Sequence, residues 1–515
     1  TPHGLLSRME HRFDLMIGGT RDLPERQRTL RGAIDWSFDQ LNETEKKLLR
    51  RLSVFVGGYT LDAAGAVCNI NGDLAQHLED ALESLIDNNL VIQLLEYEDE
   101  PRFGMLSTIQ EYARERLTES DEDEVIHKQH AQFFLDFVTL VEPRIRSAER
   151  VHWYQVMQQE FGNIRATLQW VYASRKCIDI GQQIVVKLGL FWQICGYLAE
   201  GQQWCQKMLA LSEDTTSTTL RAGLLCYEGL LIRSQNDQIA AMETINRSLE
   251  LCRQQDDKYL LGNALLIRGM IASAMRDLET ASSMFQEAID TFRSTNHIWN
   301  EVIALSWLGD VALFQNDQER ARTLHTESIR LGRQQGDPWC LMPALISSAQ
   351  VDIINGQFDL AYPKLEEIVD VLYKTDDRWS LSWTLIDLGH VVYMQGDLDR
   401  AGTYFLEGIS LANTFGNIRA LIIALAEVAA IIASRIHADD SQMNLAARLC
   451  GSTAAYIDTP GIFIWINTRN LYEQAVSHVQ SLMGADQWDQ GYSEGKNMPL
   501  DQAITLATQA LTKIE

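Results

Sequence analysis

A period of 40 residues runs through most of this 515-residue sequence and constrains its fold more than any other feature. Aspartate, alanine, glycine and tryptophan each recur at this interval, in four separate registers. The registers are Asp237, Asp277, Asp317 and Asp397 with Gln357 in the gap; Ala241, Ala281, Ala321, Ala361 and Ala401; Gly189, Gly229, Gly269, Gly309 and Gly389 with Ala349 in the gap; and Trp299, Trp339 and Trp379. Four registers with one period indicate a tandem array, in which each unit buries a face against its neighbours.

Each unit of the period is expected to contain two helices. In the unit 379–417, apolar residues recur at helical spacing up to Val392, Gly396 breaks the pattern, and Asp397 is placed to cap a second helix. The step from the repeated glycine to the following alanine is 12 residues, which puts one small residue on each helix. We therefore expect the two helices to cross closely at these positions.

The 12-residue step from glycine to alanine resembles the tetratricopeptide repeat (TPR). Phe285 and Ala288 also match the aromatic and small positions of that pattern, and Phe405 matches the aromatic one. A period of 40 rather than 34 residues lengthens each unit by about one and a half helical turns. The prediction is an all-α fold, with a TPR-like α-solenoid superhelix over 179–456 and a C-terminal helical cap over 457–515.

Residues 29–118 lie outside the period and are predicted to form a small winged-helix domain. Two helices are expected first, the second capped by Asn42 with Glu45 as a capping box. A helix over 74–88, two short strands around the acidic tip YEDEP and a helix starting at STIQ follow. Before this domain we expect the tail of a helical domain (1–28), and after it linker helices (119–178).

Several strings in this block resemble the winged-helix region of STAND signal-transduction ATPases of the NB-ARC type. They are AIDWSFDQL, LLRRLSVFVGGYTLDAA, LIDNNLVIQ and RFGMLSTIQEYARERL; HKQHAQFFLDFV, NLAARLCGSTAAY and LDQAITLATQAL resemble the bacterial branch, large transcriptional regulators with TPR arrays. The resemblance implies a switch: an upstream P-loop domain binds ADP when off and ATP when on, and the winged helix holds the autoinhibited state. The repeats would sense a ligand or partner.

The phosphate-binding motif GxxxxGK[ST] is absent from this sequence. We therefore expect no enzymatic activity and no cofactor in this chain, with ATP or ADP bound elsewhere in a longer parent protein. The lack of an initiator methionine leads to the same expectation of a longer parent. The resemblance also implies a nucleotide-sensing Met-His-Asp motif, whose equivalents here are Met105, Leu106 and Ser107. Because leucine cannot donate a hydrogen bond to phosphate, we expect Ser107 to act instead as the N-cap of the following helix.

Charge and composition exclude several function classes. The chain carries 70 acidic and 44 basic residues, a net charge of −26, and residues 73–100 contain nine acids with no lysine or arginine. A winged helix with this surface would repel DNA, so no direct nucleic-acid contact is predicted. No apolar run is long enough to span a membrane, and the eight cysteines read as reduced thiols of a cytoplasmic protein. His127, His130 and His152 lack the partners of a metal site, so no metal is expected.

The best candidates for ligand binding lie on the first helices of the repeats, which line the concave face in the TPR pattern. They are Arg233, Asn263, Asp310, Gln350, Trp383, His390 and Tyr393. These residues could bind a peptide, protein or small-molecule signal, or could form a solvated inner surface without a ligand. The tryptophan register is expected to pack between units. Two other readings of the chain stay open: a constitutive TPR scaffold for protein–protein interaction, and the regulatory tail of an upstream effector enzyme.

Overall fold

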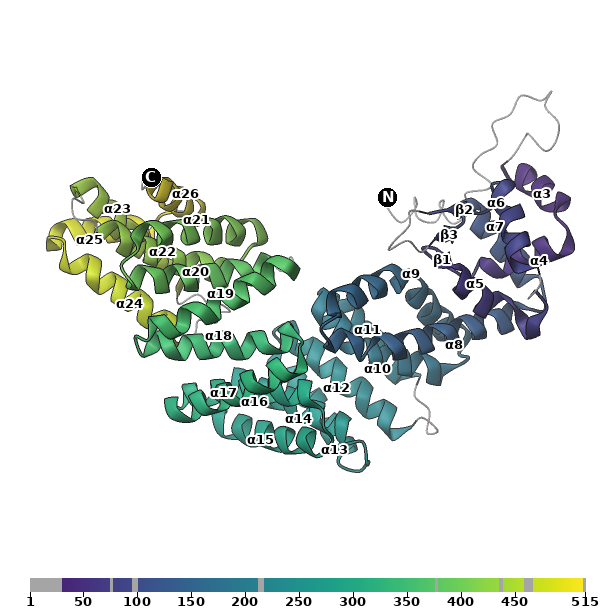
Figure 1. Ribbon diagram of the computed structural model, residues 1–515, viewed down its shortest axis with the longest axis horizontal. Coiled ribbons are helices and arrows are strands. Elements are labelled where there is room, and N and C mark those ends of the chain that lie inside the picture. Colours follow the sequence, from purple (N-terminus) through teal and green to yellow (C-terminus); the bar gives the residue numbers. More distant parts are fainter. Residues whose placement is uncertain are drawn as a thin grey trace, which may run out of the picture. The chain divides into compact units, whose positions relative to one another are not determined.

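The computed structural model describes residues 30–74, 77–94, 101–211, 217–375, 378–434, 439–457 and 466–512. It divides into two compact units, Thr1–Leu260 and Leu261–Glu515. Helices dominate both units (Figure 1), which confirms the predicted all-α, TPR-like fold with a winged-helix domain near its start. The predicted tail at 1–28 and most of the acidic tip lie outside the described residues.

The first unit begins with the winged-helix domain. Its three-stranded antiparallel sheet has the order β1-β3-β2, with Tyr59 opposite Phe103 and Ile92 opposite Gly104. The elements are α3 (Leu30–Gln40), α4 (Glu43–Leu52), β1 (Tyr59–Thr60), α5 (Leu61–Cys68), the 3₁₀ turn η2 (Ile70–Gly72), α6 (Leu78–Asp87), β2 (Ile92–Gln93), β3 (Arg102–Gly104) and α7 (Ser107–Thr118).

The predicted capping box at Asn42 is confirmed. The Asn42 side chain accepts a hydrogen bond from the Glu45 backbone N–H (3.0 Å), and the Glu45 carboxylate accepts one from the Asn42 backbone N–H (2.8 Å). Three other expectations for this domain were wrong. The sheet has a third strand, β1, which follows Gly57 and Gly58, both at positive φ. Helix α5 was not foreseen, and α6 begins at Leu78, four residues later than predicted.

The prediction for Ser107 was also wrong. Leu106, with extended φ and ψ, occupies the N-cap position of α7, and Ser107 is already the first helical residue. The strand β3 ends at Gly104, so only Met105 and Leu106 are available to turn the chain into the helix. No side chain caps this helix start.

Two long helices, α8 (Asp123–Val141) and α9 (Arg150–Ser174), follow, with the 3₁₀ turn η3 (Arg144–Arg146) between them. They share one hydrophobic core with the winged helix and with the first repeats, from Ile34 to Leu231. Asn163 on α9 accepts a hydrogen bond from the Val56 backbone N–H (2.6 Å) and donates one to the Gly58 carbonyl (2.9 Å). The connection between winged helix and array is therefore tightly packed.

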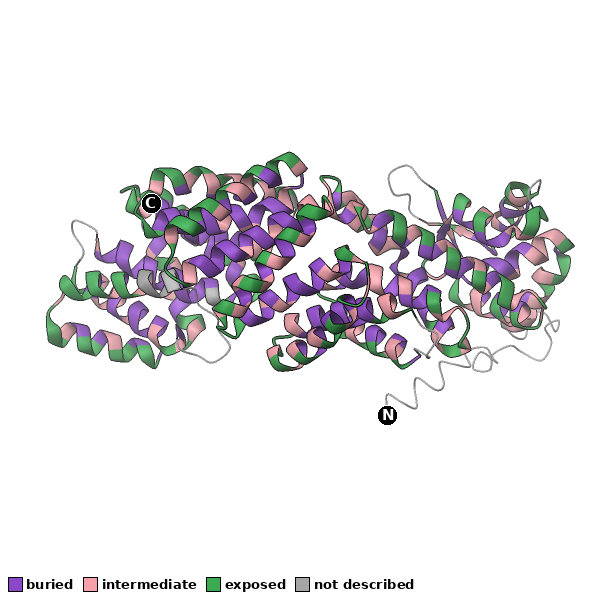
Figure 2. Ribbon diagram, turned by 90° about the horizontal axis from the view of Figure 1, so that it is seen from below, coloured by how far each residue is buried: buried purple, intermediate pink, exposed green. Residues whose placement is uncertain are grey.

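The helix pairs of the array follow one another along the chain. In the first unit they are α10 (Ile178–Cys195) with α11 (Leu198–Ala210), and α12 (Thr218–Ser234) with α13 (Gln238–Cys252); α14 (Lys258–Ala274) crosses the boundary. The second unit continues with α15 (Leu278–Ser294), α16 (Ile298–Phe314), α17 (Gln318–Gln335), α18 (Pro338–Ile354), α19 (Phe358–Thr375), α20 (Arg378–Met394), α21 (Leu398–Phe415), α22 (Ile418–Ala433) and α23 (Asp440–Ile457). Buried residues lie on the helix faces that meet one another (Figure 2).

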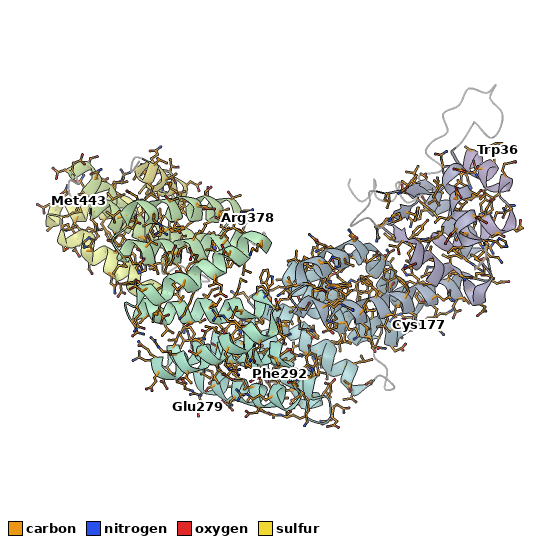
Figure 3. The ribbon with its side chains drawn as sticks, in the orientation of Figure 1. Trp36, Cys177, Glu279, Phe292, Arg378 and Met443 are labelled. Carbon is orange, nitrogen blue, oxygen red and sulfur yellow. The ribbon has the colours of Figure 1, made fainter. Side chains whose placement is uncertain are left out.

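The periodic residues have the structural roles that their spacing predicts. Asp237, Asp277, Asp317 and Asp397 each cap a second helix by accepting a backbone N–H at 3.0 or 3.1 Å. The repeated alanines are fully buried. The repeated glycine makes room for a large side chain on the partner helix: a Cβ added at Gly269 would lie 2.6 Å from the Phe285 ring. Gly262 leaves similar room for Phe292, which is labelled in Figure 3.

The chain ends with α24 (Ile466–Ser481), α25 (Ala485–Lys496) and α26 (Leu500–Thr512), which pack on α22 and α23. Helices α23 and α25 approach each other with almost no side chain between them. A Cβ added at Gly495 would lie 2.0 Å from the Arg448 carbonyl oxygen, and one at Gly451 would lie 2.1 Å from that of Tyr492. This close crossing fixes α25 against the last repeat.

Candidate ligand-binding site in the repeat array

The seven predicted ligand-binding residues do not form one site. Arg233 is on α12 in the first unit, whereas the other six are on α14, α16, α18 and α20, with Asn263 near the start of the second unit. Burial lowers the pKa of the Arg233 guanidinium to about 10.

Four of these six residues make a polar contact with the first helix of the following repeat. We call each such pair of residues a rung. Asn263 accepts a hydrogen bond from Asn300 (2.8 Å), and Gln350 donates one to Asp387 (2.6 Å). His390 Nδ1 lies 3.0 Å from Glu427 Oε2, and the fourth rung joins Asp310 to Ser347, whose hydroxyl acts to lower the pKa of the Asp310 carboxyl. In every rung the partners are 37 residues apart, which is one repeat minus about one helical turn.

The rungs are largely removed from water. Both partners are buried in the rungs of Asn263, Asp310 and His390, and burial raises the pKa of the Asp310 carboxyl to about 7. Buried polar groups of this kind must find partners inside the protein, because an unsatisfied one costs about 1–3 kcal/mol. The rungs therefore hold successive repeats in register, a role that the sequence did not predict.

The rung of His390 opens into a cavity of about 220 Å³. Three helices form it: α20 contributes His390 and Tyr393, α22 contributes Glu427, and α24 contributes His478. The remaining lining residues are Met394, Ala430, Gln474 and Ala475. Two of the seven predicted residues thus line a real cavity, and the other five are not part of its lining.

The polar groups of this cavity are linked to one another. The Tyr393 hydroxyl lies 2.8 Å from Ser434 Oγ, which in turn lies 2.9 Å from His478 Nε2. Burial by itself lowers the pKa of His390, but the charge and hydrogen bond of Glu427 outweigh it and raise the pKa above its usual value. Burial raises the pKa of the Tyr393 hydroxyl. The cavity therefore offers hydrogen-bond donors beside a carboxylate, over an apolar wall.

His478 and Gln474 could not be chosen from the sequence. They belong to α24, which lies beyond the periodic region and carries no repeat position. A weak signal existed for Glu427, because it is the one acid in a run of 14 otherwise uncharged and mostly apolar residues from 420 to 433. A carboxylate in such a run must find a buried partner.

Trp383, Trp299 and Trp339 contact other side chains of the protein, whereas Trp379 is exposed to solvent. Trp383 packs at the edge of the C-terminal core, and the Trp299 indole N–H donates to the Asp337 carboxylate of the next repeat (2.7 Å). Trp379, by contrast, is about half exposed. The predicted packing between units therefore holds for Trp299.

The equivalents of the nucleotide-sensing motif lie at the start of α7. Leu106 is exposed, and Met105 is packed at the edge of the winged-helix core. On α6, which would face DNA in a DNA-binding winged helix, Glu79, Asp80, Glu83 and Asp87 are all exposed.

All eight cysteines are free thiols, six buried and two, Cys177 and Cys195, half-buried. His130 packs against Thr167 and His127 stacks on Trp170. Within the described ranges, no group of three or more His, Cys, Asp or Glu side chains is arranged to hold a metal ion. The same ranges contain no helix that is both long and apolar enough to cross a membrane.

Two protein-family models match the chain. The MalT-like TPR region matches residues 262–450, and the winged helix-turn-helix domain matches residues 41–118. Relatives from Mycobacterium bovis and Mycobacterium tuberculosis that carry the name HTH-type transcriptional regulator are 32% identical over 310 residues. The alignment covers 57% of this chain and 34% of theirs, so the chain spans about a third of the length of these relatives.

Two solved structures are similar at low sequence identity. A STAND protein with a TPR sensor from Pyrococcus horikoshii has a TM-score of 0.38 at 16% identity, covering 80% of this chain and 70% of that one. A Rap protein complexed with competence and sporulation factor has a TM-score of 0.47 at 12% identity, covering 72% and 99%. The chain thus combines a winged-helix domain with a TPR-like array, and its residues 41–118 and 262–450 are similar to the winged helix-turn-helix and MalT-like TPR families.

Proposed function

We propose that this chain is the sensor and regulatory portion of a STAND-type ATPase switch. Its TPR region binds a ligand or protein partner, and its winged helix holds the autoinhibited state of a longer parent. The observation that carries the proposal is the cavity of Tyr393 and His478, which lies within packed repeats and is lined by linked polar groups. The name of the mycobacterial relatives, HTH-type transcriptional regulator, supports a regulatory role.

The cavity suits a small polar group, such as a peptide side chain or a small metabolite. Its volume of about 220 Å³ is below the usual range of about 300–1,000 Å³ for drug-sized ligands. A ligand that hydrogen-bonds to Tyr393 or His478 competes with Ser434, which links them. Binding would therefore change the contacts between α20, α22 and α24, and a sensor needs such a difference between its bound and free states.

The winged helix is suited to act as a protein-binding restraint. Arg51 on α4 is almost fully buried and binds both Asp73 (2.8 Å) and Glu122 (2.6 Å), which ties the domain to the start of α8. The exposed acids of α6 disfavour nucleic acid and leave a surface for the upstream nucleotide-binding domain of the parent. In this proposal ATP or ADP binds to that upstream domain, and the chain itself is not an enzyme.

A thermal-shift screen of the purified chain with peptides and small polar metabolites tests the proposal. A ligand of the cavity should raise the Tm of the wild type. It should bind more weakly to the Tyr393→Phe variant, which lacks only the hydroxyl. The matched control is Tyr373→Phe, on the exposed surface of α19, which should bind like the wild type.

Limited proteolysis then distinguishes a switch from a scaffold. A ligand that drives a switch should change the cleavage rate around residues 118–150, where the winged helix joins the array. Unchanged cleavage with a bound ligand would favour the constitutive scaffold. If no ligand binds the Tyr393→Phe variant more weakly than the wild type, this cavity is not the ligand-binding site.

A further inference from the structure

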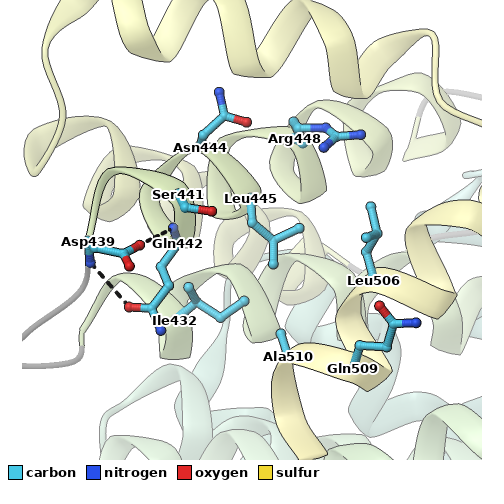
Figure 4. Close-up of a pocket in the computed structure, with 10 residues that line it drawn as sticks. All are labelled: Ile432, Asp439, Ser441, Gln442, Asn444, Leu445, Arg448, Leu506, Gln509 and Ala510. Atoms are coloured by element: carbon cyan, nitrogen blue, oxygen red, sulfur yellow. Dashed lines mark hydrogen bonds between the residues drawn. The ribbon is translucent and has the colours of Figure 1, made fainter. Parts of the chain in front are cut away.

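A second, larger cavity lies at the C-terminal end of the second unit (Figure 4). It has a volume of about 560 Å³ and lies between the end of α22, the first half of α23 and α26. Five residues of α23 line it, and four of them have the i, i+3, i+4, i+7 spacing of one helix face: Ser441, Asn444, Leu445 and Arg448, with Gln442 beside them. Leu506, Gln509 and Ala510 line it from one face of α26 in the same way.

These two faces differ from the other packed faces of the cap. Helices α23 and α26 are both part of the C-terminal core, and elsewhere in it they bury Ala446, Ala447, Ala503 and Ala507. Around the cavity the lining instead mixes amide and hydroxyl groups with leucines. The cavity opens to solvent, since Ser441 and Gln509 are exposed, and polar groups stand beside leucines in it. Such a combination is typical of ligand pockets.

Arg448 gives the cavity a cation without a strong partner. Its buried Nε atom has no hydrogen-bond acceptor in the described part of the chain; Glu494 Oε2 lies 3.7 Å away. Another guanidinium nitrogen lies 3.9 Å from the Met498 sulfur, a weak acceptor. A guanidinium binds best to two oxygens of one planar group, and a carboxylate of a ligand would supply them.

The opposite end of the lining carries a carboxylate. One oxygen of Asp439 accepts the Gln442 backbone N–H (2.8 Å), and the Gln442 side chain accepts the Asp439 backbone N–H (3.2 Å). This capping box, drawn with dashed lines in Figure 4, holds Asp439 at the edge of the cavity and leaves its other carboxylate oxygen outside the cap. That oxygen could accept a hydrogen bond from a ligand ammonium.

The separation of the two charges sets the length of the ligand. Asp439 directly precedes α23 and lies nine residues before Arg448, about 13 Å along the helix axis at 1.5 Å per residue. Side chains on a helix lean toward its N-terminus, so the guanidinium lies closer to Asp439 than its Cα does. An extended tripeptide spans about 10 Å and carries an ammonium at one end and a carboxylate at the other.

We infer that this cavity binds a short linear peptide with free termini, of about three residues, whose carboxylate pairs with Arg448 and whose ammonium pairs with Asp439. The amides of Asn444 and Gln509 provide a donor and an acceptor each, as peptide bonds require. Ile432, Leu445 and Leu506 provide an apolar contact for the middle side chain. Inorganic phosphate has no ammonium to pair with Asp439. Free leucine carries both charges but is too short to reach from Asp439 to Arg448.

Binding of the tripeptide Ala-Leu-Ala to the full chain, followed by calorimetry, tests this inference. We expect saturable binding below about 10 mM, and at least tenfold weaker binding of its C-terminal amide and of its N-acetyl form. Arg448→Gln should weaken binding at least tenfold, and so should Gln509→Glu, which replaces a lining amide with a negative charge that cannot donate a hydrogen bond to the peptide. Gln509 is exposed, so this second variant should fold normally.

The control variant is Arg333→Gln, an exposed arginine on α17, which should bind like the wild type. Tyr393→Phe should also leave tripeptide binding unchanged, so this test is independent of the cavity of Tyr393 and His478. The inference is overturned by the absence of saturable binding, by equal binding of the C-terminal amide, or by full affinity in Arg448→Gln. Competition by inorganic phosphate at equal concentration would show an anion site and would also overturn it.

Discussion

Arg102 on β3 of the winged helix donates a hydrogen bond to the carboxylate of Glu160 on α9, and both side chains are about nine-tenths buried. Asn163, one turn later on α9, donates to the other oxygen of Glu160 (2.7 Å) and to the Gly58 carbonyl (2.9 Å). The winged helix is therefore attached to α9 by a buried polar network as well as by the shared core. Such networks fix one orientation of two packed elements, since any displacement leaves buried groups unpaired.

Removing the charge of Glu160 should destabilise this junction. In Glu160→Gln the Arg102 guanidinium stays buried without its counter-charge, and we expect a loss of about 3 kcal/mol in the free energy of unfolding. Urea denaturation followed by circular dichroism measures it. The matched control is Glu200→Gln, whose pair with Arg165 (2.7 Å) is far more exposed and should cost less than about 1 kcal/mol. Equal losses in the two variants would contradict the special role of Glu160.

Residues whose role is local or periodic were predictable from the sequence. Asp277 and Asp397 cap helices because a side-chain acceptor next to a helix start acts within three residues, and the repeated alanines mark the helix crossings. Strand β1 was not predictable, because two residues carry no alternation. It forms only where the chain, turned by Gly57 and Gly58, comes alongside Phe103.

The candidate sites were harder to predict than the fold. The rungs join residues 37 apart, and this offset depends on how far each repeat turns relative to the last, which a 40-residue period does not specify. Asn263 and Gln350 were therefore assigned to an open groove, although each is hydrogen-bonded to the next repeat. The partners His478 and Gln509 come from the non-periodic end of the chain, where spacing gives no guide.

Asp310 should make the stability of the array depend on pH. Burial raises the pKa of its carboxyl to about 7, whereas in the unfolded chain it titrates near 3.9. A group whose folded-state pKa is raised contributes stability at low pH, and this is lost as the pH rises from about 4 to 7. Burial lowers the pKa of His325, 3.6 Å away, to about 3, so that histidine stays neutral in this range.

The variant Asp310→Asn removes this titration and keeps the size of the side chain. Its Tm relative to the wild type should rise between pH 4.5 and pH 8, because only the wild type has to bury a charge at the higher pH. Thermal melts at the two pH values measure the difference. A Tm difference that does not vary with pH would show that Asp310 is not the titrating group.

The repeated glycines should differ sharply in their tolerance of alanine. A Cβ at Gly309 would lie 2.4 Å from the ring of His325, which is fully buried and cannot move aside. We expect Gly309→Ala to lower the free energy of unfolding by about 1–3 kcal/mol through overpacking. The same Cβ at Gly229 meets its first neighbour, Ile245, at an ordinary 3.5 Å.

Gly229→Ala is therefore the matched control, at the same repeat position. It should be neutral or stabilise the protein by up to about 1 kcal/mol, because alanine favours helix over glycine. Urea denaturation of both variants gives the comparison. Similar destabilisation in both would mean that the register needs glycine for a reason other than the side chain that faces it.

The acidic surface of the winged helix should prevent DNA binding. Glu79, Asp80, Glu83 and Asp87 are exposed on α6, so a DNA backbone placed there meets four carboxylates. We expect no retardation of a duplex of about 30 base pairs at micromolar protein and about 0.15 M salt. Replacing all four by lysine should create weak binding that disappears as salt rises, because it depends on released counterions. Retardation by the wild type that survives high salt would refute the exclusion of nucleic acid.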